Sequence, residues 1–205
     1  MGKAIEKLLD ISGPAFIEGQ SARVAVEHPQ LQSLLRRKNG FFAFEAALRV
    51  FPTEACGQSH SLSEWNSAGL WRSNYDELAA GLLFFAEDIF GTQFCLKGGS
   101  VYTFDPETAD LELVGGDLEE WAEAIIADYD LLTGYSFAHE WQSQSGTLAY
   151  RDRLMPKLPF VCGGEFDLSN LVAMDAARSM RSRGNLAVQI HSLPDGAQVT
   201  FTIVD

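Results

Sequence analysis

The feature of this sequence that most restricts its fold is a series of short apolar segments, each followed by a turn signal. Leu82–Ala86 is rich in large apolar and aromatic side chains and meets charged residues too early for a helix, which favours a strand. Polar and apolar residues alternate in part over 92–96 and over 101–104, and "KGGS" between them is typical of a hairpin loop. The turn signal "DPET" precedes a fourth apolar segment at 111–114. Four consecutive strands with short connections predict an antiparallel meander.

Helical patterns precede and follow the meander in the sequence. Apolar spacing predicts a helix over Lys3–Asp10 and another over about 29–38, which begins at a proline and ends at Asn39-Gly40. Asp117 is a suitable N-terminal cap for a helix over about 118–132, whose apolar positions lie along one side. We expect this last helix to pack on the sheet.

Other segments are less regular. The stretch "FFAFEAALRVFP", residues 41–52, is apolar enough to be buried, and we predict a helix there. We predict a loop with at most one short element over 53–71 and an aromatic loop over 133–146. Prolines in "LMPKLPFVCGG" predict an extended segment or a sheet edge.

The C-terminal part alternates between strand and helix patterns. We predict a strand over 166–174, a helix over about 175–193 with a possible break at Gly184, a turn at 194–196 and a final strand over 199–203.

Chain length indicates the number of domains. At 205 residues and 22.5 kDa the chain can bury one substantial core and has little room for two independent domains. We therefore predict a single α+β domain over residues 1–205, with a central antiparallel sheet, the meander around 82–114, flanked by helices. Residues 1–40 are mainly helical in this prediction, and 150–205 form a strand–helix–strand extension packed on the same core.

Glu87 and Asp88 stand side by side after the first strand of the meander. If they continue the strand, their side chains point to opposite faces and cannot share one ion or one proton. If they begin a turn, Asp88 can accept hydrogen bonds from the backbone of "DIFG", and Gly91 can take a positive φ. We favour the turn, because aspartate and glycine are common turn residues.

The net charge of −13 restricts the partners of the chain. Between Asp76 and Asp130 there are fourteen acidic residues and a single base, Lys97, whereas the charges from Arg151 onward are balanced. Such a charge opposes direct binding to nucleic acid phosphates or to an anionic membrane surface. We therefore expect neither nucleic acid nor a membrane as a partner.

Known catalytic, cofactor and metal motifs do not match this sequence. "HEWQS", at 139–143, has a serine where a two-histidine zinc helix needs its second histidine, and the glycine pairs lack the spacing of phosphate-binding loops. The four histidines are scattered. We predict no catalytic residue, no cofactor and no metal, although a cysteine nucleophile paired with a distant histidine stays open.

The cysteines and the N-terminus suggest an intracellular chain. Cys56, Cys95 and Cys162 lie far apart, so we predict free thiols, with Cys95 in the core. The apolar runs are shorter than a membrane span, and the N-terminus lacks the pattern of a secretory signal. We expect a cytoplasmic location.

Two long stretches resemble a known family. They are "FFAEDIFGTQFCLKGGSVYTFDPETADLELVGGDLEEWAEAIIADYDLLTGY" and "PKLPFVCGGEFDLSNLVAMDAARSMRSRGNLAVQIHSLPDGAQV". They resemble bacterial members of the SUKH superfamily, which also includes fungal regulators of cell-wall synthesis. The similarity covers roughly residues 82–199, while "LQSLLRRKNGFFAF" is only loosely similar to the family's N-terminal helix, since Phe41 replaces the second glycine of its Asn-Gly-Gly stretch.

The resemblance implies a function in binding. It implies an α+β fold with a central antiparallel sheet, and an immunity protein that neutralises a polymorphic or contact-delivered bacterial toxin, often a nuclease. It supplies no catalytic residue. A nuclease presents a basic cleft to its substrate, so an acidic protein can associate with it rapidly and cover the cleft. The acids that we select as candidate partner-binding residues are Glu87, Asp88, Asp105, Glu107, Glu119, Glu120 and Glu123.

Two other functions remain open at this point. An intracellular scaffold or regulatory module of the same superfamily would bind partners that are not basic, and its binding would be insensitive to salt. A hydrolase would need a nucleophile and a base brought together by the fold. The sequence does not indicate the oligomeric state.

Overall fold

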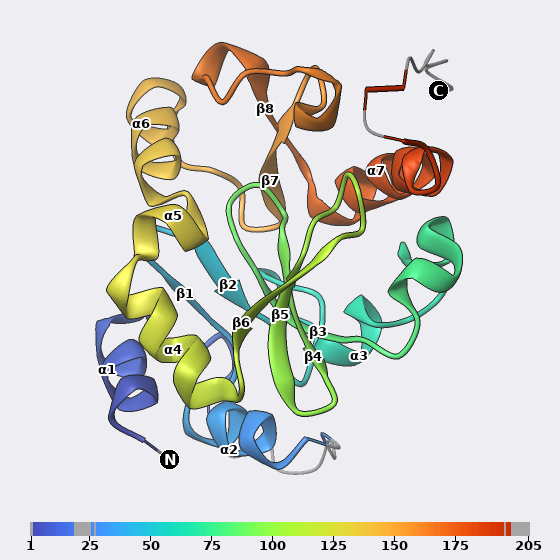
Figure 1. The fold of residues 1–205 in the computed structure, drawn as a ribbon. Helices are drawn as coiled ribbons and strands as arrows, with labels where there is room; N and C mark the ends of the chain where they lie inside the picture. The colour runs from blue at the N-terminus through green and yellow to red at the C-terminus, as the bar shows by residue number, and fades with distance from the viewer. Residues whose placement is uncertain (1, 19–25, 27, 195, 198–205) are drawn as a thin grey trace.

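The computed structural model describes residues 2–18, 26, 28–194 and 196–197, which form one α+β domain (Figure 1). Its main sheet has six antiparallel strands in sequence order. They are β1 (Phe41–Ala43), β2 (Leu48–Val50), β3 (Leu83–Glu87), β4 (Gln93–Lys97), β5 (Ser100–Phe104) and β6 (Leu111–Gly115). A second, two-stranded antiparallel sheet pairs β7 (Asp152–Pro156) with β8 (Leu171–Asp175).

Helices surround the main sheet. The α-helices are α1 (Lys3–Ile11), α2 (Pro29–Arg37), α3 (Leu62–Trp65), α4 (Leu118–Ala127), α5 (Tyr129–Thr133), α6 (Tyr135–Ser145) and α7 (Ala176–Ile190). Three short 3₁₀ segments are η1 (Arg72–Ala79), η2 (Phe160–Cys162) and η3 (Leu168–Asn170). No helix in the described part of the chain is both long enough and apolar enough to cross a membrane.

The predicted meander is confirmed as β3 to β6. The turn between β3 and β4 has Gly91 at φ +81°, a backbone conformation that glycine adopts without steric cost. The helix predicted after Asp117 begins there as well, because the Asp117 side chain accepts hydrogen bonds from the backbone N–H groups of Glu119 and Glu120. It ends earlier than predicted, since Asp128 caps a separate helix, α5.

The helix predicted over 41–52 is wrong. Those residues form the hairpin of β1 and β2, which extends the meander to six strands. Its turn contains three consecutive non-glycine residues with positive φ, namely Phe44 (53°), Glu45 (53°) and Ala46 (69°). Since each such residue carries backbone strain, contacts from elsewhere in the fold must hold the turn.

Two further predictions need correction. The aromatic loop predicted over 133–146 is largely the helix α6, and the helix predicted over 175–193 runs as α7 without a break at Gly184. The strand predicted over 166–174 is confirmed only in part, because β8 begins at Leu171. The predicted strand at 199–203 lies outside the described residues.

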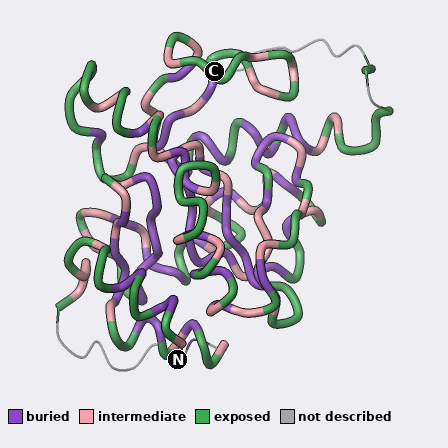
Figure 2. Tube along the Cα trace, turned by 60° about the vertical axis from the view of Figure 1, so that its left-hand side comes forward, coloured by how far each residue is buried: buried purple, intermediate pink, exposed green. Residues whose placement is uncertain are grey.

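The core lies on both faces of the main sheet, where buried segments run through the centre of the molecule (Figure 2). On one face Trp121 of α4 contacts Phe85 and Phe94, with ring centroids 5.1 and 5.8 Å apart. On the other face Trp71 and Tyr75 pack edge-on against Phe84 and Phe104 of the sheet. Burying aromatic rings at this density fixes α4 and η1 against the strands.

The two edges of the main sheet differ. At the β1 edge, the segment that follows α1 donates backbone hydrogen bonds to the sheet, from Gly13 to Phe42 (2.8 Å) and from Phe16 to Gly40 (2.8 Å). Ile17 adds a bridge to Asn39. At the β6 edge, no backbone hydrogen bond among the described residues joins 111–114 to any segment except β5. Within the described residues, one edge is therefore covered and the other is open.

Replacing Gly184 with alanine should destabilise the protein, although alanine is the better helix former. A Cβ atom at this position would lie 2.7 Å from Cε2 of Tyr75 and 3.0 Å from Cβ of Asn74, because α7 packs closely on η1. We expect overpacking of about 1–3 kcal/mol to exceed the helix-propensity gain of about 1 kcal/mol. Chemical denaturation measures the difference, and Ser182→Ala on the exposed side of α7 is the control. A more stable Gly184→Ala variant would contradict this close packing.

Candidate interaction surface

Glu87 is not on the surface, contrary to its selection as a partner-binding residue. Its carboxylate is fully buried between two buried arginines, Arg49 of β2 and Arg153 of β7. Arg49 Nη2 contacts Glu87 Oε1, Arg153 Nε lies 2.7 Å from the same oxygen, and Gln93 Nε2 donates to Oε2 at 3.0 Å. The cluster joins the small sheet to the main sheet.

The charges in this cluster shift each other's pKa values. Burial alone would raise the pKa of Glu87, but Arg49, Arg153 and the hydrogen bond from Gln93 lower it below its usual value. Burial and the nearby Arg49 lower the pKa of Arg153 to about 9, against the opposing effect of Glu87. Glu87 and Arg153 therefore both stay charged at neutral pH. Their buried ion pair gives Glu87 a structural role.

Asp88 is also buried and has the predicted turn function. Its Oδ1 atom accepts hydrogen bonds from the backbone N–H groups of Phe90 and Thr92, both at 2.8 Å. Arg183 of α7 closes the same turn by donating to the carbonyl oxygen of Phe90 at 2.7 Å. Burial raises the pKa of Asp88 to about 7. The turn prediction is confirmed, and because Asp88 is only 6% exposed it offers little surface to a partner, contrary to its selection.

The two acids of the "DPET" turn differ in exposure. Asp105 is exposed, and its carboxylate accepts from the backbone N–H groups of Glu107 (2.6 Å) and Thr108 (3.1 Å). Glu107 is buried, and its Oε2 atom accepts from the backbone N–H of Val161 at 2.9 Å. Glu107 therefore holds η2 in place and cannot contact a partner, which corrects its selection.

The three acids of α4 differ in how exposed they are, and so in how accessible they are to a partner. Glu119 is half-buried and accepts from the backbone N–H of Ala4 at 2.6 Å, so it caps the N-terminus of α1. Glu120 is exposed and accepts from the N–H of Gly116 at 2.7 Å. Glu123 is exposed as well. Of the seven selected acids, Asp105, Glu120 and Glu123 are exposed.

The structure extends the exposed acids of α4 into a larger surface. In Figure 1, α4, α5 and α6 form one column beside the sheet, with β1 behind it. We use the name α4–α6 surface for a set of exposed residues on this column and on the β1–β2 turn. They are Glu45, Glu120, Glu123, Asp128, Tyr129, Asp130, Leu131 and Glu140.

Two apolar side chains are exposed among these acids. Leu131 is 78% exposed and Tyr129 is 40% exposed. No lysine or arginine occurs anywhere between Gly98 and Tyr150. Exposed apolar side chains on the same helices as exposed acids offer the two kinds of contact that protein interfaces combine, apolar burial and charged groups.

The strained β1–β2 turn is fixed to this surface by α6. Tyr135 Oη donates to Glu45 Oε1 at 3.3 Å, His139 Nδ1 lies 2.9 Å from Glu45 Oε2, and Gln142 Nε2 donates to the backbone oxygen of Glu45. Phe44 stacks on Tyr129, with ring centroids 5.0 Å apart. These contacts supply the support that three successive positive φ angles require.

The sequence-based selection does not include six residues of this surface, which are Glu45, Asp128, Tyr129, Asp130, Leu131 and Glu140. The β1–β2 turn was interpreted as part of a helix, and α6 was interpreted as a loop, so neither was expected beside α4. The signal that could have found the surface is the absence of lysine and arginine over 98–150, which spans β5 through α6.

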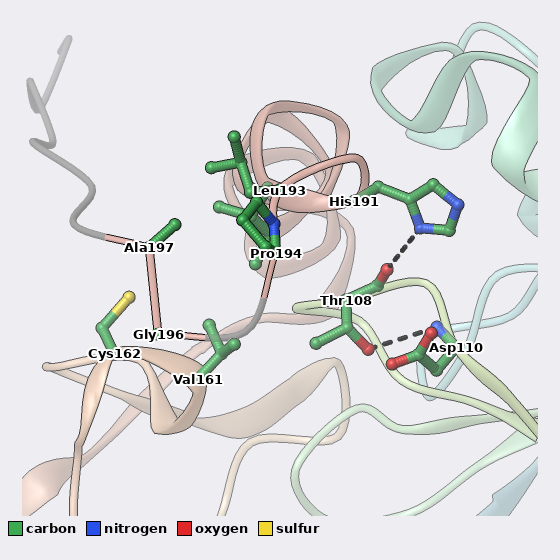
Figure 3. Close-up of a pocket in the computed structure, with 10 residues that line it drawn as sticks. Thr108, Asp110, Val161, Cys162, His191, Leu193, Pro194, Gly196 and Ala197 are labelled. Atoms are coloured by element: carbon green, nitrogen blue, oxygen red, sulfur yellow. Dashed lines mark hydrogen bonds between the residues drawn. The ribbon is translucent and has the colours of Figure 1, made fainter.

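A separate cavity of about 380 Å³ lies between the "DPET" turn, η2 and the end of α7 (Figure 3). Cys162 and His191 line it at opposite ends. His191 Nδ1 lies 3.3 Å from the backbone oxygen of Thr108, and burial with the nearby Glu107 raises the pKa of the Cys162 thiol. A thiol that stays protonated is a weak nucleophile, and this arrangement does not pair it with the imidazole.

The cysteines and possible metal ligands add no further site. All three cysteines are free, and Cys95 is buried as predicted. Among the described residues, no three histidine, cysteine, aspartate or glutamate side chains gather closely enough to hold a metal ion.

Comparisons with known proteins support the fold alone. No family model and no curated protein matches the chain. Among solved structures, Atu4351 from Agrobacterium tumefaciens is similar, with a TM-score of 0.60 over 88% of each chain and 12% sequence identity. At this identity the similarity extends to the α+β architecture and not to function.

Proposed function

We propose that this protein is a non-catalytic immunity protein that binds and neutralises a basic toxin, such as a nuclease, through the α4–α6 surface. The observation that carries the proposal is that residues 118–145 contain no lysine or arginine and expose Glu120, Glu123, Asp128, Asp130 and Glu140 together with Tyr129 and Leu131. The sequence resemblance to bacterial SUKH proteins supports the same function.

Long-range electrostatics supports fast association with such a partner. A nuclease concentrates positive charge where it binds the phosphates of its substrate, and an acidic protein is drawn into that field. The acids at Glu120, Glu123 and Glu140 then act as the rim of the interface, which governs the association rate and its salt dependence.

Short-range contacts supply the strength of binding. Leu131 and Tyr129 can enter pockets of the partner, which buries their exposed apolar area. Each Å² of apolar surface buried contributes a favourable free energy of about 25 cal/mol. Their backbone is already ordered, because Asp128 caps α5 and Phe44 stacks on Tyr129. Binding therefore requires little ordering of this surface, which favours affinity.

Co-expression tests the proposal. The probe is the product of a toxin-like reading frame next to this gene, expressed in cells with and without the protein, and we expect the protein to restore growth. The variant Glu123→Lys/Glu140→Lys should lower affinity for the purified toxin domain by about tenfold or more, since two rim charges become repulsive.

A matched control distinguishes the effect of where the charges lie from the effect of the total charge on affinity. Glu77→Lys/Glu165→Lys makes the same change in net charge at exposed residues of η1 and of the loop before η3. We expect this control to keep affinity within about threefold and to restore growth. An equal loss in both double variants would contradict a role for the α4–α6 surface.

Salt dependence distinguishes the proposal from the scaffold alternative. Exposed ion pairs are screened over about 8–10 Å at physiological ionic strength, so binding of a basic toxin should weaken as sodium chloride is raised. Isothermal titration at several salt concentrations measures this. A partner whose affinity does not change with salt would favour the scaffold or regulatory function instead.

A further inference from the structure

We propose that the open edge of β6 pairs with an extended, basic segment of the partner, which adds a strand to the main sheet. The proposal deepens the function proposed above and rests on it for the positive charge of the partner.

The described part of the chain covers one sheet edge and leaves the other open. Residues Gly13–Ile17 donate backbone hydrogen bonds to the β1 edge, whereas 111–114 make none beyond β5 among the described residues. Unpaired backbone N–H and C=O groups along a strand are a template for another strand.

The side chains of β6 indicate the composition of such a strand. Alternate residues on a strand face opposite sides, so Glu112 points to one face and Leu111 and Leu113 point to the other. Leu113 is 61% exposed, and Glu112 is exposed as well. A partner strand that alternates basic and apolar residues would place a base against Glu112 and an apolar side chain beside Leu113.

Electrostatic repulsion disfavours a second copy of this chain as the strand that pairs with β6. Antiparallel pairing of two β6 strands would bring two copies of Glu112, each next to an exposed Asp110, to the same short interface. Like charges across a strand pair are destabilising, and β6 itself contains no lysine or arginine to compensate. The same acids attract a lysine or arginine strand, so charge selects a partner of opposite sign.

The length of the open edge is limited. The register of β5 and β6 shifts after Leu113, where Val101 pairs with Gly115 and leaves Val114 as an extra residue. Such an irregularity interrupts strand pairing. The partner strand is therefore expected to pair along 111–113, before this irregularity.

A synthetic peptide tests the edge without the toxin. The probe is an acetylated and amidated nine-residue peptide of alternating lysine and valine, titrated into the full-length protein. We expect amide exchange within 111–113 to slow by about tenfold or more at saturation, with NMR shift changes centred on β6. The peptide with glutamate in place of lysine should not bind.

Two comparisons make the test decisive. A lysine–valine peptide with N-methylated backbone on its pairing side keeps the charge but loses the hydrogen bonds, so it should bind about tenfold more weakly or not at all. Glu112→Lys should weaken binding of the lysine–valine peptide by about tenfold, whereas Glu77→Lys should not. Equal binding of the N-methylated peptide, shift changes confined to the helices, or no binding would overturn the proposal.

The peptide result is independent of the immunity function. If the peptide pairs with β6 but co-expression does not restore growth, strand addition at this edge is supported and the toxin is rejected as the partner. Restored growth with no peptide effect at β6 would uphold the proposed function and reject strand addition.

Discussion

Replacing Glu87 with alanine is expected to lower the free energy of unfolding by about 3–5 kcal/mol, because two buried guanidinium groups lose their counter-ion. Arg49 and Arg153 are both fully buried around this carboxylate. Some of their donors, Arg49 Nε and Arg153 Nη2, already lack a hydrogen-bond partner among the described residues. Without Glu87 the excess of buried positive charge would rise further.

Urea unfolding followed by circular dichroism measures this loss. The control is Glu123→Ala, an exposed acid whose removal should change stability by less than about 0.5 kcal/mol. Adding Arg153→Met to Glu87→Ala should recover part of the loss, since one uncompensated charge disappears. A change below about 1 kcal/mol in Glu87→Ala would show that the cluster does not hold the two sheets together.

Replacing Asp88 with asparagine is expected to flatten the dependence of stability on pH between about pH 4 and pH 7. The folded protein holds the Asp88 proton more tightly than the unfolded chain does, since burial raises its pKa from 3.8 to about 7. A raised pKa means that this group's contribution is present at low pH and is lost as pH rises through the folded pKa. The loss amounts to at most about 4 kcal/mol, from about 1.4 kcal/mol per pKa unit.

Asparagine keeps the oxygen that accepts from Phe90 and Thr92 and carries no charge. We expect Asp88→Asn to match the wild type near pH 4 and to exceed its stability near pH 8, as measured by thermal unfolding across the pH range. Part of the wild-type slope should remain, because burial also raises the pKa of Glu107. An unchanged slope in the variant would mean that Asp88 is already ionised in the folded protein at low pH.

The parts of the fold that could be predicted are those whose turns contain recognisable residues. Gly91, the glycines of "KGGS" and the "DPET" segment mark the turns of β3 to β6, and the structure confirms all four strands. The β1–β2 hairpin has no such marker, because Phe44, Glu45 and Ala46 adopt positive φ angles that their residue types rarely take. Contacts from α6 impose that conformation, and α6 lies far away in the sequence.

The same limit applies to the candidate site. The aspartate and glycine pattern identified the turn function of Asp88, and the total charge indicated an acidic surface. The burial of Glu87 depends on Arg49 and Arg153, which only the folded chain brings to it. Counting charges along a sequence therefore identified the kind of surface and not which carboxylates reach it.

The segment Gly13–Ile17, which bonds to the β1 edge, has a consequence for anyone who shortens this chain. The strand beneath it, "FFA", carries no charge that would repel a neighbour. A version that lacks residues 1–18 would expose the β1 edge in addition to the β6 edge, which no other described segment covers. Head-to-tail stacking of such molecules into filaments would then compete with folding as a soluble monomer.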